Sequence, residues 1–124
     1  MPIQILGADG NPLTSRDVDA SANNFVYLNG RLSFSGNYPS GGDTLDFTTV
    51  ADKILSDQCV AVYVASQTMG NQYISIGGPA TALNAWKVFC QSPGTFNTQL
   101  SAGAYPSAIT SDTVTFTACF RKLL

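Results

Sequence analysis

Apolar and polar residues alternate along three stretches of the chain, at residues 25–36, 83–91 and 113–122. A period of two is typical of a β-strand that buries one face and exposes the other. The pattern predicts that one set of alternate side chains points into a core: Val26, Leu28, Leu32, Phe34, Trp86, Val88, Cys90, Val114, Phe116, Ala118 and Phe120.

The remaining segments predict the same class of structure. Residues 59–66 form a β-branched apolar run, and residues 69–78 combine a Gly-Asn turn with another strand, so we expect these two to form a hairpin. Residues 48–57 predict about two helical turns. Roughly seven or eight short strands with little helix indicate an all-β fold, an antiparallel β-sandwich or barrel of jelly-roll type.

The chain of 124 residues predicts a single domain, because no repeat, linker or charge run divides it. Residues 1–24 carry turn chemistry and a polar run, and so differ from the alternating pattern of residues 25–124. We expect residues 1–24 to form an extended arm, dispensable for the sandwich core at 25–124, that contacts a neighbouring molecule. Its apolar residues Ile3, Ile5 and Leu13 are candidate contacts.

Charge narrows the classes of partner. Only 11% of residues are charged, the net charge is −2 and histidine is absent. A protein binds nucleic acid largely because its Lys and Arg side chains release counterions from the phosphates, and a chain with a net negative charge lacks this driving force. We therefore expect no nucleic-acid partner. No apolar run reaches about 18 residues and the first residues do not resemble a signal peptide, so we expect no membrane and synthesis in a cytoplasm.

The candidate chemistry is sparse. Without histidine, the commonest general base and metal ligand are missing, so we expect no enzyme, metal or cofactor. Asp43 and Asp46 could act as paired carboxylates or as calcium ligands, but a calcium loop usually presents oxygens at alternating positions around a glycine turn, so we expect Asp43 to cap a turn and Asp46 to face solvent. Three cysteines spaced 31 and 29 residues apart predict free, packed thiols rather than a disulfide framework or a metal site.

Tyrosines offer the clearest candidate contacts with a partner. The parity of Tyr27 and Tyr63 is opposite to that of the core set, so they predict either an interface or a second packed layer. Tyr38 precedes Pro39 at an expected loop tip, where a partner could reach it. The candidate interface is therefore Ile3, Ile5, Leu13, Tyr27, Tyr38 and Tyr63.

Three segments together resemble the small β-rich virion proteins of tailed phages, of the capsid decoration (cement) type: FSG at 34–36, GGDTLDF at 41–47 and LSAGAYPSAI at 100–109. The resemblance implies a protein on the outside of the assembled head that bridges capsomers. Its partner would be the major capsid protein, its location the virion, and its own oligomer a homotrimer in preference to a dimer.

A carbohydrate-binding β-sandwich on a virion surface or tail is the alternative function. A pocket edged by exposed aromatic rings would favour the carbohydrate module. Flat faces rich in hydroxyl groups, with an extended N-terminal arm, would favour the capsid protein.

Overall fold

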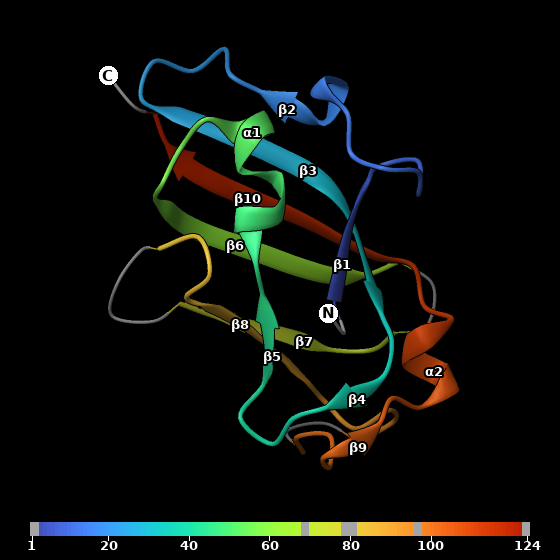
Figure 1. Cartoon of the computed structure of the whole chain (residues 1–124). Coiled ribbons are helices and arrows are strands. Elements are labelled where there is room, and N and C mark those ends of the chain that lie inside the picture. Colours follow the sequence, from blue (N-terminus) through green and yellow to red (C-terminus); the bar gives the residue numbers. More distant parts are fainter. Residues whose placement is uncertain (1–2, 68–69, 78–81, 96–97, 123–124) are drawn as a thin grey trace.

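The computed structural model describes residues 3–67, 70–77, 82–95 and 98–122 (Figure 1). Strands predominate over helix, at 46% against 13%, and every strand pair is antiparallel, which confirms the predicted all-β fold. The jelly-roll arrangement stays a prediction.

Two sheets and one short ribbon carry the described strands. The main sheet has the order β1-β3-β10-β6, and the short β2 also pairs with β3. Its strands are β1 (Ile3–Gly7), β2 (Val18–Asp19), β3 (Phe25–Phe34), β6 (Cys59–Ser66) and β10 (Val114–Arg121). The second sheet has the order β5-β8-β7, from β5 (Asp43–Leu45), β7 (Tyr73–Ile76) and β8 (Trp86–Cys90), and the ribbon pairs β4 (Asn37–Tyr38) with β9 (Gly103–Ala104).

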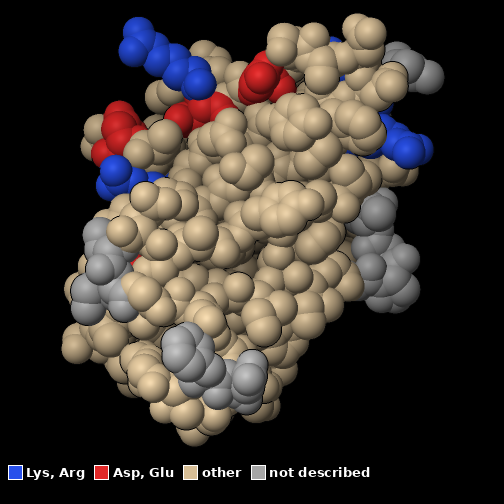
Figure 2. Space-filling model, turned by 180° about the vertical axis from the view of Figure 1, so that it is seen from behind, with Lys and Arg blue, Asp and Glu red and all other residues tan. Residues whose placement is uncertain are grey.

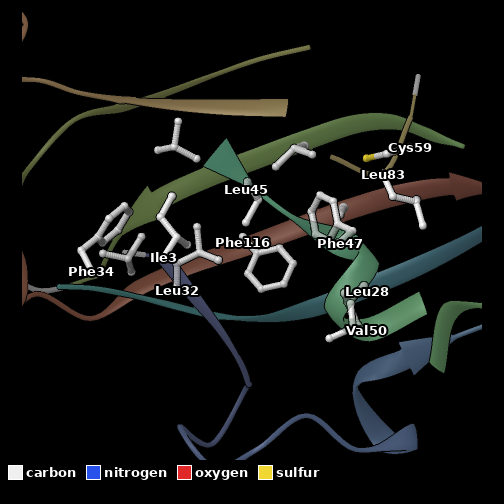
Figure 3. Close-up of a cluster of buried hydrophobic side chains, with 14 of the residues drawn as sticks. Ile3, Leu28, Leu32, Phe34, Leu45, Phe47, Val50, Cys59, Leu83 and Phe116 are labelled. Atoms are coloured by element: carbon white, nitrogen blue, oxygen red, sulfur yellow. The ribbon is translucent and has the colours of Figure 1, made fainter. Parts of the chain in front are cut away.

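One helical segment covers a face of the main sheet: it consists of η2 (Phe47–Val50), which continues directly into α1 (Ala51–Ile54). Two further short helices, η1 (Ser15–Asp17) and α2 (Ser107–Thr110), lie elsewhere. The predicted two helical turns are therefore present, and they end where Leu55 takes the left-handed conformation, with φ of 51°. The ring of Phe47 lies 6.2 Å from that of Phe116 (Figure 3). It also meets the ring of Phe120 edge-on, with the ring centres 5.0 Å apart. These contacts join the helical turns to β10.

The alternation of side chains fixes which face of each strand is inside. On β3 and β10 the predicted inward set is buried, and on β8 Val88 and Cys90 are buried while Trp86 is half-buried against the core. In the main sheet Leu28 lies opposite Ala118, and Leu32 opposite Val114, so inward residues meet in rows across the strands. Apolar burial along these rows is the main favourable contribution to folding.

The N-terminal segment is not a free arm. Residues 3–7 pair with residues 30–34 as β1, and Ile3 is only 2% exposed beside Leu32 and Phe34 (Figure 3). Leu13 is also buried. The prediction of an arm that the core does not need was wrong, because Ile3 and Leu13 supply part of that core.

The predicted hairpin between β6 and β7 was also wrong. The two strands belong to different sheets, and β7 pairs with β8 instead. Side chains of the second sheet bond to carbonyl oxygens of β6: Ser75 donates its hydroxyl to Val62, and the Trp86 indole N–H donates to Cys59 over 3.2 Å. These bonds connect the second sheet to β6, an edge strand of the main sheet.

Candidate functional site

The six candidate interface residues lie in three places. Tyr27 and Tyr63 stand on the main sheet, on the side away from the core, while Ile3, Ile5 and Leu13 line a groove beside β1. Tyr38 lies in the interior. Five of the six candidates therefore lie on two separate surfaces, two of them on the outward side of the main sheet and three in the groove beside β1.

Tyr38 was wrongly predicted to be reachable by a partner, since it is only 1% exposed. Its hydroxyl accepts hydrogen bonds from the Cys90 backbone N–H and from the Gln99 side-chain amide, over 3.3 and 2.8 Å. Its ring meets that of Tyr105 edge-on at 5.7 Å. Because a buried phenol needs a partner for its hydroxyl, these bonds account for an interior position just before a turn.

The first surface, here called the outer face, consists of outward residues of β3, β6 and β10: Tyr27, Asn29, Arg31, Tyr63, Thr115, Thr117 and Cys119. These side chains alternate with the buried ones on β3, β6 and β10, and Asn29, Thr117 and Tyr63 lie side by side in register. Thr117 donates its hydroxyl to the Asn29 amide oxygen over 2.8 Å. Tyr63 is 72% exposed, so within the described residues no second layer packs over it.

A shallow hollow of about 330 Å³ opens on the outer face. Uncharged residues alone line it, namely Ala8, Asn29, Gly30, Tyr63, Val64, Ala65, Thr115, Phe116 and Thr117. On the face seen from behind, the visible charged side chains gather mostly in the upper part and leave most of that face without charge (Figure 2). A partner would therefore meet hydroxyl, amide and aromatic groups in this hollow.

The second surface, here called the β1 groove, runs between β1 and the η2–α1 turn and has a volume of about 490 Å³. Its lining is Ile3, Gln4, Ile5, Leu6, Pro12, Leu13, Ser35, Thr49, Val50 and Lys53. Only Lys53 among these carries a charge. Sequence analysis found three of the apolar members but missed Val50 and Lys53, because they come from a separate helical segment.

Asp43 and Tyr105 form a buried polar contact. Asp43 is 3% exposed, and the Tyr105 hydroxyl donates to its carboxylate over 2.5 Å. Burial raises the pKa of Asp43, although the Tyr105 bond and the Lys87 charge act in the opposite direction. The expected turn-capping role of Asp43 was wrong. Asp46 caps η2 instead, accepting from the Thr48 N–H over 2.9 Å.

The described residues hold little reactive chemistry. Burial raises the pKa of Cys59 and of Cys90 to about 12, so both thiols stay protonated near neutral pH. All three thiols are free, as predicted. Across the described ranges, no three His, Cys, Asp or Glu side chains gather as a metal site would require. In the same ranges, every helix is too short or too polar to span a membrane.

No family model matches the sequence, and neither curated proteins nor solved structures gave a match.

Proposed function

We propose that the protein is a capsid decoration protein that binds the outside of an assembled phage head through its outer face. The observation that carries the proposal is the exposed Tyr63 beside a hollow of the main sheet that uncharged residues line. Tyrosine combines a large apolar area with a polar tip and is enriched in protein interfaces. The main sheet fixes the backbone of Tyr63, and the tyrosine side chain has only two χ angles to order on contact.

Weak contacts by each copy are enough for stable binding when many copies bind to the regular lattice of a phage head. Copies that bind at equivalent positions of an assembled head gain affinity when they are linked to one another. A homotrimer that bridges capsomers through the major capsid protein has this geometry. The resemblance of residues 34–36, 41–47 and 100–109 to virion proteins supports the same partner.

Co-sedimentation with purified heads of the parent virus tests the proposal. Intact protein should sediment with mature, expanded heads and far less with compact proheads. Tyr63→Ala should weaken binding by about tenfold or more, as removal of a central interface aromatic commonly does. Leu55→Ala is the matched control, because Leu55 is 71% exposed and lies on another part of the surface. Deletion of the first 20 residues is not a usable test, since it removes β1.

Ionic strength gives an independent check. No charged residue lines the hollow beside Tyr63, and Arg31 is the charged residue that shares this side of β3, so binding should change only modestly between low and high salt. Binding that falls steeply with salt would point to the charged part of the surface and contradict docking through Tyr63.

A carbohydrate-binding module is the second candidate, and the hollow beside Tyr63 favours it. An exposed ring next to the Asn29–Thr117 hydrogen-bonded pair offers both a stacking surface and polar groups for sugar hydroxyls. Binding to a glycan array, lost in Tyr63→Ala, together with failure to sediment with any form of the head, would replace the capsid proposal with this one.

A further inference from the structure

We propose that the β1 groove binds an extended peptide segment of a partner protein, which adds to the free edge of the main sheet as a further strand and places a carboxylate against Lys53. This site is separate from the outer face and does not depend on the function proposed above.

The free edge of β1 can be assigned residue by residue. Gly7 lies opposite Gly30 but donates its N–H to the Asn11 carbonyl oxygen over 2.8 Å, away from β3. The Leu6 carbonyl oxygen, in contrast, lies close against Gly30. In an antiparallel ladder alternate residues turn their N–H and C=O groups to the same side. Leu6 therefore bonds toward β3, and Ile5 directs its N–H and C=O away from it.

Ile5 lines the β1 groove, so we infer that these backbone groups lie along its edge. In the parts of the chain that the structure describes, no hydrogen bond joins them to another residue on this edge. An unpaired strand edge is a template for another strand. Main-chain bonds then supply affinity, and pockets for alternate side chains supply selectivity.

The rest of the lining suits such a strand. Val50 and Leu13 are apolar and line the groove together with Ile3 and Ile5, so alternate side chains of a bound segment would meet apolar surface. A slot between an edge strand and a helical turn is the geometry in which peptide-binding domains add a strand. The volume of about 490 Å³ falls within the usual range of ligand sites.

Charge identifies the kind of segment. Lys53 is the charged member of the lining, and its ammonium lies 3.9 Å from the carboxylate of Asp52, an exposed neighbour and a weak partner. A segment with an acidic residue complements Lys53. A second copy does not fit as well, since the longer edge strands β1 (IQILG), β6 (CVAVYVAS) and β7 (YISI) carry no carboxylate. The edge strands with an aspartate are short: β5 has three residues and its Asp43 is buried, and β2 has only two residues.

The test is an NMR titration of the full-length ¹⁵N-labelled protein with a capped peptide of alternating valine and threonine that ends in aspartate. The amides of residues 3–7 and 49–53 should shift, and hydrogen exchange of the Ile5 amide should slow. A peptide ending in lysine should bind about two- to fivefold more weakly, the scale of one exposed ion pair. Lys53→Glu should reverse this preference.

Two further arms isolate the strand addition. Of two peptides N-methylated on alternate sets of amides, only one should bind, because one set bonds to β1 and the other faces outward. Ile5→Pro should cut affinity at least tenfold while Ile5→Val keeps it, since proline removes an N–H that the β3 ladder does not use. The peptide arm needs no protein variant and stays decisive if Ile5→Pro fails to fold.

Three results would overturn the proposal: no shift at residues 3–7 with millimolar peptide, equal binding of both methylated peptides, or a dimer formed through β1 that excludes peptide. Head binding is measured separately through Tyr63→Ala, so failure of either proposal leaves the other standing.

Discussion

Removal of a single hydroxyl, in Tyr105→Phe, should destabilise the protein by about 2 kcal/mol at neutral pH. The hydroxyl donates to the buried Asp43 carboxylate over 2.5 Å, and a hydrogen bond to a charged group contributes about 1.5–3 kcal/mol. The ring stays packed 5.4 Å from Phe34 and 5.7 Å from Tyr38, so the substitution opens no large cavity. Against a total stability of about 5–15 kcal/mol, such a loss is readily measured.

The effect should depend on pH in a defined direction. Burial raises the pKa of Asp43 in the folded state, so this group contributes most to stability below its ordinary pKa of 3.8, and that contribution is lost as pH rises through the folded pKa. The Tyr105 bond lowers the pKa of Asp43, so its removal raises that pKa further. The cost of Tyr105→Phe should therefore be about 1 kcal/mol near pH 3, where the bond joins two neutral groups, and rise toward about 2 kcal/mol near pH 7.

Urea unfolding of the native protein, Tyr105→Phe, Asp43→Asn and the double variant, each at pH 3 and pH 7, measures these quantities. With Asp43→Asn present, the hydroxyl bonds a neutral amide, so its removal should cost only about 1 kcal/mol at either pH. A cost of Tyr105→Phe below about 0.5 kcal/mol, or one that is equal at both pH values, would refute the assigned role of the buried pair.

Three further predictions concern the fold and its thiols. Gly30→Ala should cost more than about 2 kcal/mol in urea unfolding, because its Cβ would strike the Leu6 carbonyl oxygen, whereas Gly41→Ala, with open space around it, should stay within about 0.5 kcal/mol. Asp17→Ala should cost about 1–2 kcal/mol and speed hydrogen exchange at Ala8 and Thr14, whose N–H groups donate to its carboxylate, while the exposed Asp57→Ala should do neither. Thiol titration should count three free thiols in denaturant, but in the native protein at pH 8 the half-buried Cys119 should react well before the buried Cys59 and Cys90.

The strands with one buried face could be predicted from sequence because their side-chain period is a local property. Each inward residue of β10 is apolar and each outward one between Val114 and Phe120 is threonine or cysteine, so the face of every residue follows from parity. The same parity identified Tyr63 as outward. Parity could not tell whether Tyr63 is exposed or covered by a second layer, because this depends on which other parts of the protein pack on that side of the sheet.

Long-range contacts account for the wrong predictions. Residues 3–7 form too short a segment for its sequence pattern to reveal that it pairs with β3. The buried position of Leu13 depends on elements far along the chain. Tyr38 appeared to sit at a loop tip, but its hydroxyl bonds to Cys90 and Gln99, more than 50 residues away. Val50 and Lys53 join the β1 groove only because the η2–α1 turn folds over the main sheet.

The segments that resemble virion proteins have a structural explanation, which affects where binding specificity resides. Asp43 in the first long segment bonds Tyr105 in the second, and Gly42 packs so closely on Phe89 that a side chain would crowd the ring. These residues hold the second sheet and the β4–β9 ribbon together, so the segments have a structural role in this chain. Selectivity for a partner must then come from surface residues outside them, such as Tyr63 and Lys53. We therefore expect proteins that share the buried pair to differ at these two positions when they bind different partners.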